Sequence, residues 1–162
     1  MAVSEKSIMR LELLGARLLV VDDDLCIRRL LTSLFREHGA VVEAVSDGIE
    51  GLELALKEEF SIIILDVDLP YLSGGEMASR IRRLKPSSKL LALTALTDES
   101  RLRKLYQSGF DIVLQKTISE SELVEIIGKC IGTDEKFLFQ EAVKKHSPII
   151  DRSGDQLPCL SG

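Results

Sequence analysis

The chain has 162 residues, of which 45% are hydrophobic, 29% charged and 4% aromatic, and its formal net charge at pH 7 is −5. This is the composition of a globular domain, and because no uninterrupted apolar run exceeds four residues, a bilayer-spanning helix is excluded. The negative charge and the few aromatic rings argue against direct nucleic-acid binding, and three widely spaced cysteines predict free thiols. We therefore expect a cytoplasmic protein without membrane contact.

Short apolar runs of strand length recur along the chain and alternate with stretches of helical spacing. The runs are rich in valine, isoleucine and leucine, which is typical of parallel strands buried on both faces. They lie at 18–21, 41–45, 62–65, 90–93 and 110–114. Gly39, Pro86 and Gly109 end three of the predicted helices, and a capping box of Ser119 and Glu122 begins the last. The alternation predicts an α/β fold, a doubly wound five-stranded parallel sheet with helices on both faces.

The helical stretches carry apolar faces and two sets of basic residues. The predicted apolar faces include Leu30 and Leu31 in the first helix, Ile49 and Ala55 in the second, and Ile81 and Leu84 in the third. The basic sets are Arg80, Arg82, Arg83 and Lys85, and then Arg101, Arg103 and Lys104. We interpret both sets as solvated helix faces, with docking of an acidic partner as the alternative.

Three segments divide the chain. Residues 1–15 are interpreted as an N-terminal lead-in, residues 16–132 as the folded domain, and residues 133–162 as a C-terminal extension. In the extension, apolar spacing around Phe139 and Val143 predicts a short helix, and the prolines and glycines after Ser147 predict a disordered tail.

Polar side chains follow four of the five predicted strands. In open α/β sheets, ligands bind at the carboxyl ends of the strands, so these side chains should converge on one edge. They are Asp22 and Asp23 after the first strand, Asp66 and Asp68 after the third, Thr94 after the fourth, and Lys116 after the fifth.

This set of residue types suits magnesium and a phosphoryl group. Clustered carboxylates resist ionisation unless a cation lies among them, and Mg²⁺ is bound by one or two carboxylates while it keeps several waters. A lysine and a hydroxyl beside such a metal would bind phosphoryl oxygens, and a carboxylate can act there as a nucleophile that forms an aspartyl phosphate. A nearby aspartate, Asp24, is interpreted as a helix N-cap, and His38 as a solvated helix end.

Four motifs in this order resemble the receiver domain of two-component response regulators, of the single-domain type. They are LLVVDDD at 18–24, IIILDVDLP at 62–70 with Gly74, LALTA at 91–95, and the segment from Gly109 to Lys116. The resemblance implies the flavodoxin-like receiver fold, in which the strand order is 2-1-3-4-5.

The resemblance also implies roles for the residues. Asp66 would be the phosphoacceptor, Thr94 the switch hydroxyl, and Lys116 the cation that pairs with the phosphoryl group and the carboxylates. Mg²⁺ would be held by Asp22, Asp23, Asp66 and the backbone carbonyl of Asp68. The phosphoryl donor would be a phosphohistidine of a sensor histidine kinase or a histidine phosphotransfer protein, and the output would pass to a protein partner that the sequence does not name.

Three positions depart from the usual family pattern or vary within it. Thr117 follows the lysine where the family usually has proline in a cis bond; because a cis bond to a non-proline residue costs about 2.5–4 kcal/mol, we predict a trans bond and a reshaped loop. Val113 occupies the position at which the family usually has an aromatic side chain that rotates inward on activation. Because valine has no ring to rotate, the usual coupling between Thr94 and that side chain is absent. The Asp68 carboxylate is predicted to modulate phosphate loss, with faster loss favoured if it acts as a general base.

Two other functions stay open on the sequence. Asp66 and Asp68 also resemble the DxD motif of haloacid-dehalogenase-type phosphatases, with Thr94 and Lys116 as the second and third motifs. Pro70 and the lack of an acidic strand end after the lysine count against this enzyme. The other alternative is a phosphorylation-independent interaction module, which the departures at Val113 and Thr117 favour.

Overall fold

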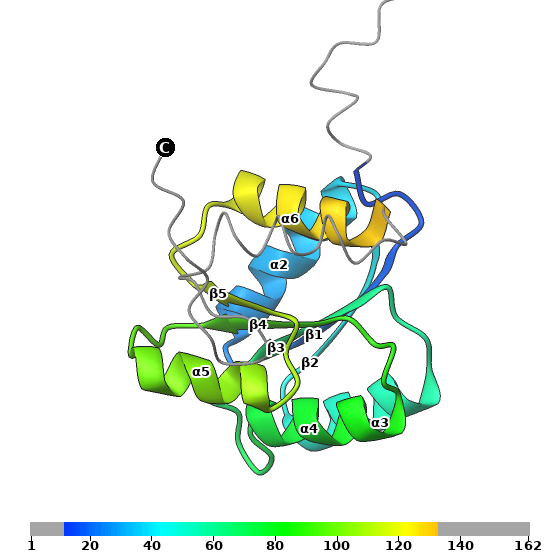
Figure 1. The fold of residues 1–162 in the computed structure, drawn as a ribbon. Helices are drawn as coiled ribbons and strands as arrows, with labels where there is room; N and C mark the ends of the chain where they lie inside the picture. Colours follow the sequence, from blue (N-terminus) through cyan, green and yellow to red (C-terminus); the bar gives the residue numbers. More distant parts are fainter. Residues whose placement is uncertain (1–11, 133–162) are drawn as a thin grey trace, which may run out of the picture.

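A computed structural model describes residues 12–132, which form a five-stranded parallel sheet between two layers of helices (Figure 1). The strand order is β2-β1-β3-β4-β5, as expected from the resemblance. The elements are β1 (Arg17–Val21), α2 (Leu25–Glu37), β2 (Val41–Val45), α3 (Gly48–Lys57), β3 (Ile62–Asp66), α4 (Gly74–Leu84), β4 (Leu90–Thr94), α5 (Glu99–Gln107), β5 (Ile112–Gln115) and α6 (Glu120–Gly132).

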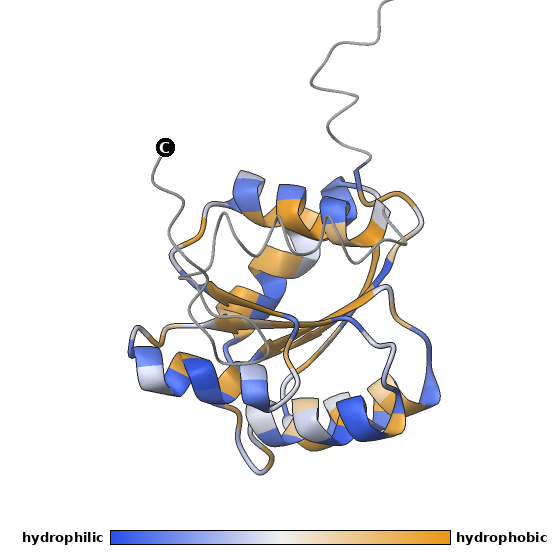
Figure 2. Ribbon diagram, viewed as in Figure 1, coloured by the Kyte–Doolittle hydropathy of each residue, from blue (hydrophilic) through white to orange (hydrophobic). Residues whose placement is uncertain are grey.

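The two faces of the sheet carry separate apolar cores. Alternate residues of β1 point to opposite faces: Leu18 and Val20 belong to the core under α2 and α6, and Leu19 and Val21 to the core under α3, α4 and α5. Figure 2 shows the apolar sheet between the inward faces of the helices. Because every central strand is covered on both sides, its sequence is almost continuously apolar, as the sequence pattern predicted.

The helices begin at capping residues. The Asp24 carboxylate accepts hydrogen bonds from the backbone N–H of Cys26 and Ile27, which confirms its predicted role as an N-cap. At α6, the Glu122 N–H donates to the Ser119 hydroxyl and the Ser119 N–H donates to the Glu122 carboxylate, so the predicted capping box is formed. His38 is the C-cap of α2, and its Nδ1 lies 2.8 Å from the Leu34 carbonyl oxygen.

Some residues of the predicted apolar faces are exposed. Leu30, Ile49 and Leu84 have exposed fractions of 46%, 52% and 58%. Each lies beside the buried stripe of its helix, and a single sheet covers only a narrow stripe of a helix, so the outermost apolar positions face solvent. The fifth strand begins at Ile112 rather than Phe110, because the left-handed turn at Gly109 delays strand pairing; Phe110 is nevertheless fully buried.

One part of the predicted solvated basic face is wrong. The Arg82 guanidinium is mostly buried and donates to the carbonyl oxygen of Gly109, to that of Ser88 and to the Asp111 carboxylate. Lys85 donates to the carbonyl oxygens of Ala55 and Glu58. The sequence pattern predicts that both side chains are solvated, because it does not show which backbone carbonyls the fold brings close to the end of α4.

Residues 12–132 include the predicted folded domain but not the outer parts of the chain. None of the helices within residues 12–132 is long and apolar enough to cross a membrane. Most of the predicted lead-in (1–11) and the predicted extension with its helix and tail (133–162) lie outside the described residues. The domain bounds of 16–132 therefore stay a prediction.

Candidate functional site

The carboxyl ends of the strands place the predicted site residues along one edge of the sheet. Asp22 directly follows β1, Asp66 ends β3, Thr94 ends β4, and Lys116 directly follows β5. Because β1, β3, β4 and β5 are consecutive neighbours and all parallel, these four positions lie next to one another in the order of the sheet.

Three carboxylates meet at this edge. One oxygen from each of Asp22, Asp23 and Asp66 lies within 4.8 Å of the other two. Asp22 and Asp66 are buried, with exposed fractions of 2% and 7%, while Asp23 is exposed and leaves the cluster open to solvent. The Asp24 N–H donates to Asp22 Oδ1 over 2.9 Å and so fixes that carboxylate at the start of α2.

Lys116 joins two of these carboxylates. Its Nζ lies 3.0 Å from Asp22 Oδ2 and 3.4 Å from Asp66 Oδ1. Burial lowers the pKa of Lys116, but the hydrogen bond to Asp22 and the charges of Asp22 and Asp66 outweigh burial, so its pKa is raised above the usual value. The lysine is therefore a fixed positive charge at neutral pH.

Asp66 is held in an environment that disfavours its charge. Burial, and then the charge of Asp22, raise the pKa of Asp66, while Lys116 and the Val67 N–H, which donates to Asp66 Oδ1 over 2.8 Å, oppose the rise. A single lysine among three carboxylates leaves an excess of negative charge. Oxygen ligands with excess negative charge and access to solvent fit a hard divalent cation such as Mg²⁺.

Thr94 is fully buried and reaches this group through its backbone. The Thr94 carbonyl accepts a hydrogen bond from the Lys116 N–H over 2.8 Å, and the Thr94 hydroxyl oxygen accepts one from the Leu96 N–H over 3.1 Å. In this conformation the Thr94 hydroxyl thus contacts its own loop.

The loop after β3 supports Asp66 from behind. The Gly74 N–H donates to the Val67 carbonyl, and a Cβ at Gly74 would lie 2.2 Å from the carbonyl oxygen of Asp66, so only glycine fits. Asp68 is exposed on this loop. Tyr71 on the same loop is 88% exposed and has a φ of 66°, which is unusual for a residue with a side chain.

The predicted departures from the family pattern lie beside the site. The bond between Lys116 and Thr117 is trans, as predicted, since residues 12–132 contain no cis peptide bond. Val113 is buried in the core that also holds Leu102 and Tyr106 of α5. A branched aliphatic side chain therefore fills the position at which the family usually carries a ring.

One residue at the site was missed by sequence reasoning. Arg28 Nη1 donates to the backbone carbonyl of Asp22 over 2.7 Å. Arg28 lies one helical turn after the N-cap Asp24. This spacing places its side chain on the side of the helix that faces the end of β1, and it is the one sequence signal for the contact. An arginine on a helix is otherwise read as solvated, so the sequence alone did not single it out.

Comparison with known proteins places the chain among receiver domains. Residues 18–128 match the family model of the response regulator receiver domain. The chain is 34% identical over 121 residues to the sensor protein GacS of Pseudomonas syringae, covering 72% of this chain and 13% of GacS. It is 37% identical over 109 residues to the transcriptional regulatory protein HprR of Escherichia coli, covering 67% of this chain and 48% of HprR. The chain thus spans less than half the length of either curated relative.

A solved structure shares the same fold. The receiver domain of the sensor histidine kinase PA1611 from Pseudomonas aeruginosa aligns with a TM-score of 0.69 at 27% identity, covering 74% of this chain and 99% of that domain. That structure holds a magnesium ion in its active-site cleft.

Proposed function

The chain belongs to the response regulator receiver domain family, and on that premise we propose that Asp66 accepts a phosphoryl group from a phosphohistidine in a Mg²⁺-dependent reaction. The observation that carries the proposal is the contact of Lys116 Nζ with Asp22 and Asp66, inside a group of three carboxylates whose oxygens lie within 4.8 Å. The donor would be a sensor histidine kinase or a histidine phosphotransfer protein. Family members act as phosphoacceptors in signalling rather than as classical enzymes.

The transfer step follows from the contacts of Asp66. Its Oδ1 is engaged by the Val67 N–H and lies 3.4 Å from Lys116 Nζ, which leaves Oδ2 to attack phosphorus. A bond forms between Oδ2 and phosphorus as the phosphorus–nitrogen bond breaks, and the imidazole leaves with the electron pair. Lys116 then pairs with the negative charge of the phosphoryl oxygens.

Asp22, Asp23, Asp66 and the backbone carbonyl of Asp68 would hold the metal. When bound, Mg²⁺ supplies positive charge that neutralises the phosphoryl oxygens and the crowded carboxylates. The raised pKa of Asp66 supports this assignment, because a cation in the cluster would restore the ionised carboxylate that the attack requires.

The output would begin at Thr94. Its hydroxyl accepts a hydrogen bond from the Leu96 N–H. If the hydroxyl moved onto a phosphoryl group, it would lose this hydrogen bond and donate one to the phosphoryl oxygen, and the loop before α5 would shift. Val113 has no ring to follow that movement, so the signal would pass through the backbone of the loop and the surface of α5, β5 and α6 to an as yet unidentified protein partner. The exposed Asp68 carboxylate would position water and shorten the lifetime of the phosphoryl group.

The test is reaction with acetyl phosphate, read by intact mass. We expect the wild type to gain one phosphoryl group with Mg²⁺ and none with EDTA, and Asp66→Ala to gain none. Asp98→Asn is the matched control, since this exposed carboxylate caps α5 and an asparagine caps equally well. Asp68→Asn should still be labelled but lose the group more slowly.

The same experiment separates the alternatives. Repeated turnover of a free phosphate ester with Mg²⁺ would favour the phosphatase that uses Asp66 and Asp68. A wild-type protein that gains no mass would favour the phosphorylation-independent interaction module.

A further inference from the structure

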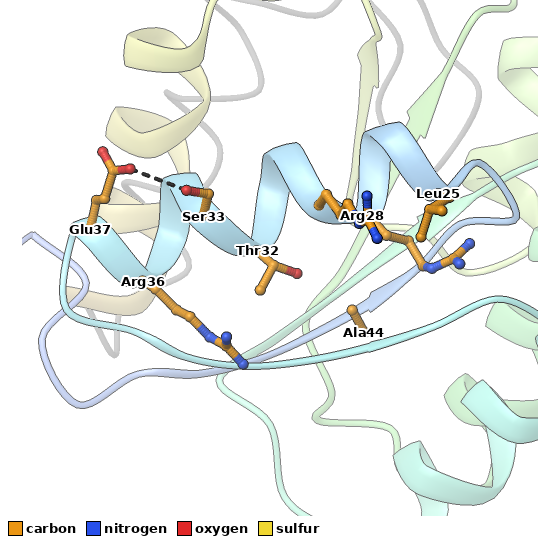
Figure 3. A pocket seen from close by; sticks show the side chains of 8 residues that line it. Leu25, Arg28, Thr32, Ser33, Arg36, Glu37 and Ala44 are labelled. Atoms are coloured by element: carbon orange, nitrogen blue, oxygen red, sulfur yellow. Dashed lines mark hydrogen bonds between the residues drawn. The ribbon is translucent and has the colours of Figure 1, made fainter.

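A groove lined by arginines lies between α2 and β2, at the outer edge of the sheet (Figure 3). Its volume is about 650 Å³. Eight residues line it: Leu25, Arg28, Arg29, Thr32, Ser33, Arg36, Glu37 and Ala44. In Figure 3, Thr32 of α2 lies across from Ala44 of β2, and the Arg36 side chain extends toward the strand.

The groove concentrates positive charge in a chain whose net charge is negative. Three of its lining residues are arginines and one is an acid, Glu37, whose carboxylate accepts a hydrogen bond from the Ser33 hydroxyl at the far end of α2. Arg28 and Arg36 each give one hydrogen bond to a backbone carbonyl, those of Asp22 and Val42. A guanidinium has five N–H donors, so most of them stay available to a ligand.

The spacing of the arginines favours an extended ligand over a single small anion. Arg36 lies eight positions after Arg28, which corresponds to about 12 Å along the helix axis. One phosphate or carboxylate cannot contact both ends. A chain that carries acidic side chains at intervals can, because each carboxylate can pair with a different guanidinium.

The edge of β2 adds backbone donors and acceptors to the groove. The Val41 N–H and the Val45 carbonyl bond toward β1, to the Ala16 carbonyl and the Asp22 N–H. In a parallel strand the alternate residues Val42 and Ala44 therefore turn their N–H and carbonyl groups outward. Arg36 contacts the Val42 carbonyl at 3.3 Å, and Ala44 lines the groove itself, so an added strand would meet both the backbone edge and the arginines.

We propose that the α2–β2 groove binds an extended acidic segment of a partner protein. The segment pairs with the outer edge of β2 and directs alternate carboxylates to Arg28, Arg29 and Arg36. A nucleic acid fits less well, because none of the described residues that line the groove is aromatic, Glu37 adds a negative charge at one end of the groove, and the chain is acidic overall. Phosphorylation of Asp66 is not required for this binding.

The probe is a fluorescein-labelled peptide of alternating glutamate and valine, titrated with the full chain and followed by anisotropy. We expect saturable binding that weakens with salt, and at least about a tenfold loss of affinity in Arg29→Glu and in Arg36→Glu. Arg83→Glu, an exposed arginine on α4, is the matched control and should bind within about twofold of the wild type. Ala44→Pro should also weaken binding, since proline removes an outward N–H while it is tolerated on an edge strand.

Folding of each variant is checked separately by circular dichroism, and labelling with acetyl phosphate should be the same as in the wild type. Four results would overturn the proposal: no saturable binding, equal binding of an alternating lysine and valine peptide, unchanged affinity in Arg29→Glu, or displacement of the peptide by an equal concentration of inorganic phosphate. Tighter binding of a single-stranded oligonucleotide than of the peptide would identify a nucleic-acid groove instead. Since labelling reads the Asp66 site and anisotropy reads the groove, failure of one does not imply failure of the other.

Discussion

Asp66 illustrates how a single side chain is placed where its charge is unfavourable. Burial and the neighbouring Asp22 carboxylate raise its pKa, and the Lys116 ammonium offsets only part of this effect. The folded state therefore holds a proton on Asp66 more tightly than the unfolded chain does. The resulting loss of stability is absent below the ordinary pKa of aspartate, develops as the pH rises through the raised folded pKa, and is complete only above that pKa.

Replacing this charge should stabilise the metal-free domain. We expect Asp66→Asn to raise the melting temperature in EDTA at pH 7.5 by a few degrees, and to raise it less as the pH falls through the raised pKa of Asp66, where the wild-type carboxylate takes up its proton. Differential scanning calorimetry across pH measures both effects, and added Mg²⁺ should narrow the difference.

Asp68→Asn is the control for that measurement. It makes the same chemical change two residues along the chain, but its carboxylate is exposed, so the melting temperature should not move. An equal gain in both variants, or no gain at Asp66, would contradict the account of Asp66 as a disfavoured charge.

At the scale of elements, the β3–α4 loop is held against the strand by a close backbone approach. Gly74 begins α4, and its N–H donates to the Val67 carbonyl at 3.0 Å. A side chain there would meet the carbonyl of Asp66, so the start of the helix and the end of the strand occupy fixed positions relative to each other.

Gly74→Ala should separate these two elements. A Cβ 2.2 Å from a carbonyl oxygen forces the backbone to move, and we expect a loss of about 2 kcal/mol in the free energy of unfolding, with slower labelling of Asp66 by acetyl phosphate. Urea unfolding monitored by circular dichroism measures the stability.

The neighbouring glycine provides the comparison. A Cβ at Gly75 would have only the Ser108 side chain nearby, at 3.3 Å from its hydroxyl oxygen, so Gly75→Ala should be neutral or slightly stabilising. If both variants lost the same stability, the close contact of position 74 with the Asp66 carbonyl would not explain the loss.

At the scale of the whole molecule, Arg82 connects elements that are far apart in the sequence. It lies on α4, donates to the Gly109 carbonyl before β5, and pairs with Asp111, whose carboxylate also accepts from the Leu90 N–H at the start of β4. The Asp111 side chain is only 7% exposed, so the guanidinium stabilises a carboxylate that has little contact with water.

Arg82→Met should therefore destabilise the fold strongly. It removes the guanidinium that pairs with the Asp111 side chain, which is only 7% exposed, and loss of such an ion pair costs about 3 kcal/mol in the free energy of unfolding. Arg83→Met removes an exposed arginine from the same helix and should change the stability by less than about 0.5 kcal/mol. Chemical unfolding of both variants checks the prediction, and equal stabilities would show that the Arg82 contacts contribute nothing.

The strands, the parallel sheet and the residues at its carboxyl edge could all be predicted from the amino-acid sequence. Apolar runs bounded by turns specify buried strands, and parallel strands bring their carboxyl ends to one edge, so the convergence of Asp22, Asp66, Thr94 and Lys116 could be predicted before any contact was seen. The N-cap at Asp24 and the capping box at Ser119 were equally local and equally predictable.

The partners of the polar side chains and the exposure of the apolar ones depend on long-range packing and could not be predicted from the sequence. Arg28, Arg36 and Arg82 look alike in the sequence, yet they contact the carbonyls of Asp22, Val42 and Gly109, because those carbonyls come from segments that folding brings beside the helix. The exposure of Leu30 and Ile49 depends likewise on how far the sheet extends under each helix. Local pattern sets the elements, whereas long-range packing sets the environment of each charge.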